Sequence, residues 1–156
     1  MKKTTTYARK RARCAVRLVN PLHLIESQQL ASEQAPGQVT NWSLRGALAF
    51  DAVLKGAASK EDICTLIAVQ AISASFIMGG VGTEYEHIVQ ASKAAIDALQ
   101  RRHLRTGSSA VNHQERTAIS ELLQLHDALM EIATVRMIEQ AHAWAVASIK
   151  VLQENP

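Results

Sequence analysis

The chain has 156 residues, enough for one domain with its own hydrophobic core, and an apolar fraction of 47% excludes a wholly disordered protein. Aromatic residues make up only 4%, whereas Ala, Leu, Ile and Gln are abundant, so the composition favours helices over strands. The net charge of +3 is unevenly distributed, because the first 25 residues hold seven cations and no acid. The remaining residues hold ten Lys or Arg against fourteen Asp or Glu. This division predicts a basic tail that meets an anionic partner and a body that folds independently.

The basic tail is predicted to be a flexible arm over residues 1–19, followed by a single helical domain over residues 20–156. Lys and Arg in such a segment neutralise phosphates, so we expect the arm to bind nucleic acid. An acidic protein surface and a leader without a specific partner remain alternatives. Few apolar anchors accompany the cations, which argues against a membrane surface. The predicted nucleic-acid-binding residues of the arm are Lys2, Lys3, Arg9, Lys10, Arg11, Arg13 and Arg17.

The two cysteines, Cys14 and Cys64, are not spaced as metal ligands. No apolar segment follows the first basic residues as it would in a secretory leader, so both cysteines are expected to be reduced thiols of a cytoplasmic protein. An Arg-rich start without acids also resembles a transit peptide in composition, which would matter in a eukaryotic source.

Two helices are expected before residue 57. Asn20 followed by Pro21 is a start signal for a short helix that ends near the linker at 35–37. The second helix is predicted to begin at residue 40 or 41 and to be capped by Gly56.

Capping boxes predict the next two helices. Ser59, with an acid three residues later, predicts a third helix over about 60–78. Its uncharged stretch from Ile63 to Met78 is shorter than the roughly 20 residues of a membrane span, so we predict the central helix of a bundle. The loop at 79–82 is expected to be a flexible elbow. Thr83 and Glu86 form a second box, predicting a fourth helix to about residue 105 that stops at Gly107.

A long C-terminal helix is predicted over residues 113–152. Asn112 and Glu115 form its capping box, and no Gly or Pro follows until Pro156. Forty helical residues would span about 60 Å, whereas a compact domain of this size is only about 40 Å across. Either part of the helix therefore leaves the body, or the helix breaks near residue 140 and folds back. The sequence favours the first alternative.

Beyond residue 134 the apolar residues of this helix no longer keep to one face. A helix that is apolar on all sides has to be covered on all sides, so we expect a homo-oligomer or a protein partner. The predicted interface residues are Val135, Ile138, Trp144, Val146 and Ile149.

A second basic group lies at the end of the fourth helix, in Arg101, Arg102 and Arg105. These residues are predicted to extend the nucleic-acid-binding surface. Cations are also favoured in the last turn of any helix by the helix dipole, which explains the group equally well.

No catalytic residue, cofactor or metal site is predicted. The pairs Glu84–His87 and Glu139–His142 have the spacing found in di-iron bundles, but the inward carboxylates that such a site needs on two further helices are missing. His126 lies on an apolar stripe and is expected to be a core histidine with a satisfied hydrogen bond.

The chain resembles a loose set of uncharacterised short helical proteins of proteobacteria and their mobile elements. The shared features are the basic start, Asn20-Pro21-Leu22, the Gly-x-Gly-x-Glu turn at 80–84, the Arg-Arg-x-x-Arg-Thr-Gly run at 101–107 and Leu-x-x-His-Asp-x-x-Met at 123–130. The resemblance implies a bacterial or phage setting and no particular activity.

Together these patterns predict an all-α protein. Its expected architecture is an up-down bundle of four to five helices with a basic N-terminal arm and a long C-terminal helix. The expected function is that of a non-enzymatic bacterial or phage accessory protein that binds nucleic acid. The alternative is a protein–protein interaction module, a homodimer or an inhibitor or adaptor of a host system, that uses the apolar C-terminal helix.

Overall fold

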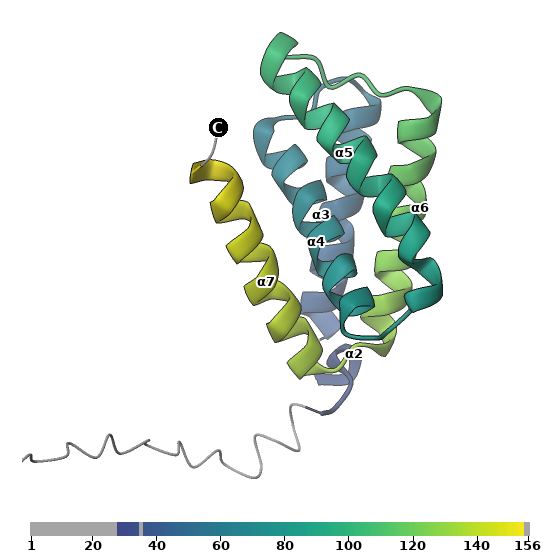
Figure 1. Ribbon diagram of the computed structural model, residues 1–156. Coiled ribbons are helices and arrows are strands. Elements are labelled where there is room, and N and C mark those ends of the chain that lie inside the picture. Colours follow the sequence, from purple (N-terminus) through teal and green to yellow (C-terminus); the bar gives the residue numbers. More distant parts are fainter. Residues whose placement is uncertain (1–27, 35, 155–156) are drawn as a thin grey trace, which may run out of the picture.

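The computed structural model describes residues 28–34 and 36–154 (Figure 1). The described chain is all-α, as the composition predicts. The arm and the first part of the short helix predicted after Pro21 lie outside the described residues, as does Cys14. In the described part of that predicted helix, residues 28–30 are not helical and α2 begins only at Ala31. The elements are α2 (Ala31–Gln34), α3 (Pro36–Leu54), α4 (Lys60–Met78), the 3₁₀ turn η1 (Thr83–Tyr85), α5 (Glu86–Thr106), α6 (His113–Ile132) and α7 (Val135–Glu154).

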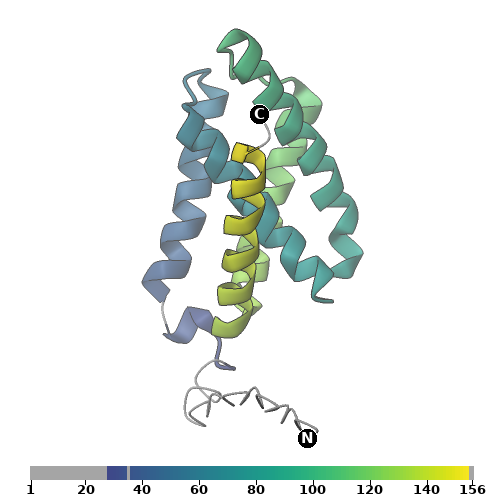
Figure 2. The same cartoon turned by 60° about the vertical axis from the view of Figure 1, so that its left-hand side comes forward.

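Helix α4 occupies the centre of the molecule, where it contacts α3, α5, α6 and α7 (Figures 1 and 2). A central helix has no wholly solvated face, which explains why Ile63 to Met78 carry no charge. Within the described residues, α4 alone is long and apolar enough to cross a membrane by length and composition. Half of its most apolar window is buried inside the bundle, so the prediction of a central bundle helix is confirmed.

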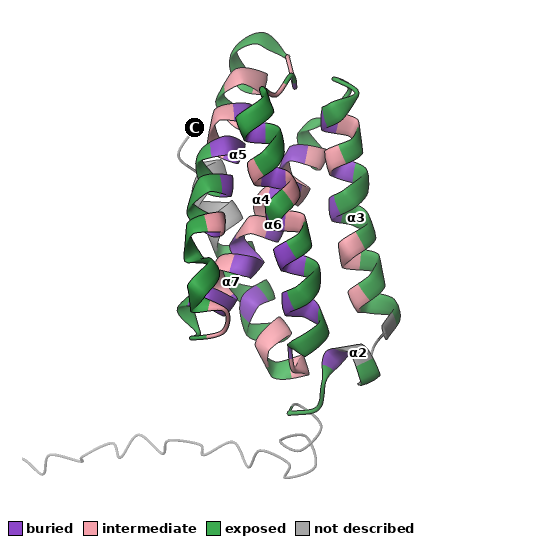
Figure 3. Cartoon of the chain, turned by 90° about the vertical axis from the view of Figure 1, so that its right-hand side faces the viewer, coloured by how far each residue is buried: buried purple, intermediate pink, exposed green. Residues whose placement is uncertain are grey.

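The buried residues lie on the inward faces of the helices (Figure 3). They form two apolar clusters along α4. The first joins α3, α4, α5 and α6, and its largest fully buried members are Leu66, Ile96, Leu99, Ile119 and Leu122. The second joins α4, α5, α6 and α7, and includes Ile72, Phe76, Leu129, Met130 and Ala141. Each of the long helices α3 to α7 thereby contributes buried side chains to at least one of the two clusters.

Two of the predicted capping boxes are confirmed. At the start of α4, the backbone N–H of Asp62 donates to Ser59 Oγ at 3.2 Å, and the Ser59 N–H donates to the Asp62 carboxylate at 2.8 Å. At the start of α6, Asn112 and Glu115 make the same reciprocal pair at 2.8 and 3.0 Å. Each box satisfies two backbone donors that the first turn of a helix leaves unpaired.

The capping box predicted at Thr83 is wrong. Residues Thr83–Tyr85 form the 3₁₀ turn η1, and α5 begins at Glu86 with no side-chain cap. The turn follows Gly82, whose φ of 71° lies in the left-handed region that favours glycine. The chain therefore turns tightly before α5, and Thr83 is inside the turn instead of preceding a helix.

The predicted start of the second helix is also wrong, because α3 begins at Pro36 and not at residue 40 or 41. Proline fits the first helical position, where its missing N–H would have no partner. The predicted end is confirmed. Helix α3 stops at Leu54, and the N–H of Gly56, which has a φ of 68°, donates to the Val53 carbonyl at 3.0 Å.

The single helix predicted over residues 113–152 is wrong, and the alternative of a break that folds the end back is what the structure shows, although the chain breaks between α6 and α7 and not near residue 140. Ala133 is extended, with ψ of 136°, and Thr134 forms an isolated antiparallel bridge with Leu30. The Ala31 N–H donates to the Ala133 carbonyl at 2.9 Å, and the Val135 N–H donates to the Gln29 carbonyl at 3.1 Å. Backbone groups that a continuous helix would pair internally are thus paired by residues 29–31, and α7 turns back to lie along α4 (Figure 1).

Candidate functional site

The predicted nucleic-acid-binding residues fall into two separate parts. The seven cations of the arm lie outside the described residues. Arg101 and Arg105 are exposed at the end of α5, and no ion pair joins either of them to another described residue. The end of α5 lies at one end of the bundle, and α2, where the described chain begins, lies at the other (Figures 1 and 2). The end of α5 therefore does not adjoin the point where the described chain begins.

Arg102 has a structural role that the sequence did not indicate. Its guanidinium donates to Glu115 Oε1 at 2.6 Å and to the Ala110 carbonyl, and so ties α5 to the start of α6. Burial alone would raise the pKa of Glu115, but hydrogen bonds from Arg102 and Asn112, together with the Arg102 charge, hold that pKa below its usual value. A guanidinium held in this way has fewer donors left for a phosphate.

The predicted interface residues differ in how far they are buried. Val135 and Ile138 are half-buried, and Ile138 packs against the second core cluster. Trp144 and Val146 remain 40% and 39% exposed. Ile149 belongs to α7, but its side chain lies outside the described part of the structure. Because α7 folds back, the protein itself covers part of the apolar surface of α7 that was predicted to need a partner.

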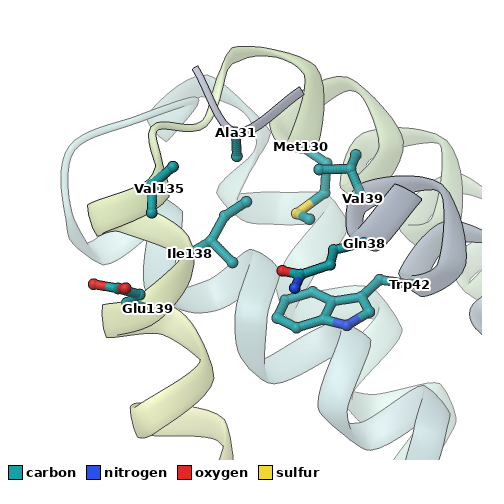
Figure 4. Close-up of a pocket in the computed structure, with 8 residues that line it drawn as sticks. All are labelled: Ala31, Gln38, Val39, Trp42, Met130, Val135, Ile138 and Glu139. Atoms are coloured by element: carbon teal, nitrogen blue, oxygen red, sulfur yellow. The ribbon is translucent and has the colours of Figure 1, made fainter. Parts of the chain in front are cut away.

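An apolar cavity of about 100 Å³ lies where α2, α3, α6 and α7 meet (Figure 4). Its wall includes Val39 and Trp42 from α3, Met130 from α6 and Ile138 from α7. The polar side chains in its lining are Gln38 and Glu139. With so few polar groups, this cavity offers little chemistry beyond apolar contact.

A second cavity, of about 150 Å³, lies beside the first between α3, α4 and α7, with His126 of α6 in its wall. Trp42 lines both cavities, and its ring stacks on His142 with centroids 5.5 Å apart and an interplanar angle of 27°. The complete lining is Trp42, Arg45, Thr65, Ala68, Val69, Ile72, His126 and His142. This cavity brings together more polar side chains than the first.

His126 is the most strongly perturbed group at this cavity. It is 1% exposed, and its Nδ1 lies 3.3 Å from Ser73 Oγ. Burial lowers the pKa of His126 from 6.5 to about 4, although the nearby Asp127 charge opposes the shift. The imidazole is therefore neutral at pH 7. The expectation of a core histidine is confirmed for its position, but among the described residues only Nδ1 of its two ring nitrogens has a hydrogen-bond partner.

Neither Glu-x-x-His pair forms a metal site in the described part of the chain, where no cluster of three or more His, Cys, Asp or Glu residues could hold an ion. His87 Nδ1 lies 3.1 Å from the Glu84 backbone carbonyl, and His142 stacks on Trp42.

Sequence reasoning missed the residues that surround His126. Its position on the apolar stripe marked it as buried, but Ser73, Arg45 and Trp42 come from other helices whose relative rotation no local pattern reveals. Comparison with known proteins adds no assignment, since no family model, no curated protein and no solved structure matches the chain.

Proposed function

We propose that this chain is a non-enzymatic accessory protein of a bacterium or phage that binds nucleic acid in the cytoplasm through its basic arm, residues 1–19. In this proposal the helices form an up-down bundle that carries the arm. The observation that carries the proposal is the charge division, with seven cations and no acid in the first 25 residues. Such a segment attracts polyphosphate independently of sequence.

The charges of the described residues support an arm-based mode of binding. These residues hold ten Lys or Arg against thirteen Asp or Glu, an acidic balance that disfavours a broad phosphate-binding face on the bundle. Three of the ten cations are paired within the bundle: Lys55 with Asp51 at 2.5 Å, Lys93 with Asp97 at 2.6 Å, and Arg102 with Glu115 at 2.6 Å. Of the three cations predicted to bind at the end of α5, Arg101 and Arg105 have no ion pair among the described residues and are proposed as a minor second contact.

The test replaces all seven arm cations with Gln and measures binding to labelled duplex DNA and to RNA by fluorescence anisotropy. If all seven contact phosphates, affinity of the unaltered protein for duplex DNA should fall by three to four orders of magnitude between about 50 and 200 mM salt. The substituted protein should bind weakly and with little salt dependence.

The control for this test replaces Arg101 and Arg105 with Gln. It should remove at most two phosphate contacts and leave most of the affinity and most of the salt dependence. Equal affinity of the arm-substituted and unaltered proteins would overturn the proposal. A larger loss in the control than in the arm variant would move the site to the end of α5.

A protein-interaction surface is the second candidate. Leu44 and Leu48 lie one turn apart on α3 and are 54% and 59% exposed, and Val146 on α7 is exposed as well. Large apolar side chains in neighbouring positions on a helix surface mark a contact face more often than single ones do. This candidate keeps the predicted homo-oligomer but adds residues of α3 to those predicted on α7.

A further inference from the structure

The apolar cavity between α2, α3, α6 and α7 has an incompletely covered wall. Of the residues that line it, Ala31 and Met130 are buried, whereas Val39, Val135 and Ile138 are only half-buried. Figure 4 shows these five side chains arranged around one common space. Apolar surface that faces water favours the binding of another apolar group, so the cavity calls for an apolar occupant.

The described chain begins beside this cavity. Ala31 is part of the lining, and backbone hydrogen bonds of 3.1 and 2.9 Å hold Gln29 and Ala31 to the turn between α6 and α7. The chain turns at residue 28, so the residues before it do not continue the line of Gln29 and Ala31. Even fully extended, the stretch from Ile25 to Ala31 spans at most roughly 20 Å, and the turn shortens it. The residues just before position 28 are therefore within reach of the cavity.

The residues within that reach are apolar. Leu22, Leu24 and Ile25 follow the arm closely, and no Lys or Arg occurs between Arg17 and Arg45. The cavity volume of about 100 Å³ suits one aliphatic side chain, because a cavity of about 150 Å³ accommodates a benzene ring. Such a side chain gains free energy by leaving water, and its short connection to the bundle keeps the entropic cost of bringing it to the cavity small.

We propose that this cavity is the docking site of residues 22–25 of the same chain, one of whose apolar side chains enters between Val39 and Ile138. The docked segment fixes the point from which the basic arm leaves the bundle, at the end where α2 lies (Figure 1). The proposal does not rest on nucleic-acid binding, because apolar contact and not the cations of the arm holds the segment.

Limited digestion with thermolysin tests the docking, since this protease cuts before large apolar residues. A docked segment is cut only while it is detached, so its cleavage rate reports how often it leaves the cavity. The bonds to follow are those before Leu24 and Ile25, and the bond before Leu18 in the arm is the internal reference. Mass spectrometry of the products gives each rate in the full-length protein.

Val39→Phe is designed to fill the cavity from α3. It should speed cutting before Leu24 and Ile25 by about tenfold, the factor that burial of one leucine supports, and leave cutting before Leu18 unchanged. The matched control is Val146→Phe, which adds the same atoms at a position on α7 that is 39% exposed. It should leave all of these cleavage rates unchanged.

Trp42 gives an independent readout because it lines the cavity. In a Trp144→Phe background it is the single tryptophan of the chain. Replacing the apolar residues of the segment with Ser should shift the Trp42 emission to longer wavelength, because water then reaches the indole. The residues replaced are Leu22, Leu24 and Ile25. The matched control, which should leave the emission unchanged, places Ser at three apolar positions of the arm, Val16, Leu18 and Val19.

Circular dichroism establishes that each variant is folded before it is measured. Cutting before Leu24 and Ile25 that is equally fast in the unaltered protein and in Val39→Phe overturns the proposal, as does the same emission shift in both serine variants. If the Trp42 emission of the unaltered protein changes on dilution, a second copy and not residues 22–25 covers the cavity, and the proposal is overturned as well. None of these measurements involves nucleic acid, so they leave the test of the arm unaffected.

Discussion

His126 shows how one buried side chain makes the stability of this fold depend on pH. Its ring is enclosed by the core, and among the described residues its one hydrogen bond is to Ser73, so the protonated form would lose hydration without gaining a partner there. The pKa is therefore lowered to about 4, mainly by burial. The unfolded chain has no such restriction and takes up the proton near pH 6.5.

The first prediction is that the protein loses stability as the pH falls from about 6.5 to 4. In this window the unfolded chain binds a proton that the folded chain excludes, and the full difference corresponds to about 3 kcal/mol. Urea unfolding at a series of pH values measures it. His126→Leu should flatten the curve in this window. A curve unchanged by that substitution, or an NMR titration of His126 with a midpoint near 6.5 in the folded protein, would contradict the assignment.

Arg102 illustrates a cation whose role depends on its partners. The second prediction is that Arg102→Gln lowers the free energy of unfolding by about 2 kcal/mol, because it removes a charged hydrogen bond to the largely buried Glu115. Arg101→Gln, one residue away and exposed, should change stability by less than about 0.5 kcal/mol. Chemical denaturation at pH 7 measures both.

The stability contributed by the Arg102–Glu115 ion pair also depends on pH. Because the pKa of Glu115 is lowered below 4.5 in the folded protein, its contribution is present above that pH and is lost as the pH falls further. The difference in stability between Arg102→Gln and the unaltered protein should therefore shrink below pH 4.5. A constant difference would show that Arg102 stabilises the fold mainly through the Ala110 carbonyl.

At the level of whole elements, the turns between helices determine how the helices pack against one another. Gly82 precedes η1 with a φ of 71°, and a Cβ at this position would lie 3.3 Å from a methyl carbon of Leu129 and 3.4 Å from one of Ile77. The backbone conformation and the space both favour glycine there. Gly37, by contrast, lies in α3, and a Cβ added to it would have no atom within 4 Å.

The third prediction uses these two glycines as a matched pair. Gly82→Ala should cost about 1–2 kcal/mol, since alanine is strained in the left-handed region and crowds two core side chains. Gly37→Ala should be neutral or stabilise by up to about 1 kcal/mol, because alanine favours helix. Thermal unfolding of both variants checks the pair. Equal effects would mean that the turn before α5 accommodates a side chain.

Signals within one segment allowed several elements to be predicted from the sequence. Ser59 and Asn112 marked true helix starts, and Gly56 and Gly107 marked true ends, because caps depend on neighbours within a few residues. The break at Ala133 could not be predicted in this way, since its backbone groups are paired by residues 29–31, which are distant in sequence. The change of apolar face beyond residue 134 was a local sign of this break in the sequence.

The candidate site was even less predictable. The position of His126 on an apolar stripe indicated burial, which the structure confirms. Its pairing with Ser73 and its place in one cavity wall with Arg45 and Trp42 depend on how three helices are rotated against one another. Such rotations follow from the summed packing of the core, and no short motif records them.

For the whole molecule, the fold-back of α7 changes the expectation about self-association. A continuous helix over residues 113–152, which would have needed a partner to cover its apolar end, does not form. Helix α7 instead packs against α4 of the same chain. Among the exposed apolar residues that remain for a partner are Leu44 and Leu48, one turn apart on α3, and Val146 on α7.

The fourth prediction concerns the exposed apolar surface formed by Leu44 and Leu48 on α3. If it joins two copies, sedimentation velocity at tens of micromolar should show a dimer, and Leu44→Lys with Leu48→Lys should convert it to a folded monomer. Lys at the exposed position Ala47 serves as a control for added charge on the same helix. A protein that sediments as a monomer at every concentration would eliminate the homo-oligomer, and the surface would then have to serve a different partner or none.

The pairing of Leu30 with Thr134 has a consequence for the order in which the molecule assembles. It joins positions about a hundred residues apart, and contacts across so long a stretch of chain form late because closing the stretch is entropically costly. Among the α7 side chains that the structure describes, those fully enclosed are Ala141 and Ala145, which bury little area. We therefore expect α3 to α6 to assemble first, with α7 as the last helix to dock and the first to come away.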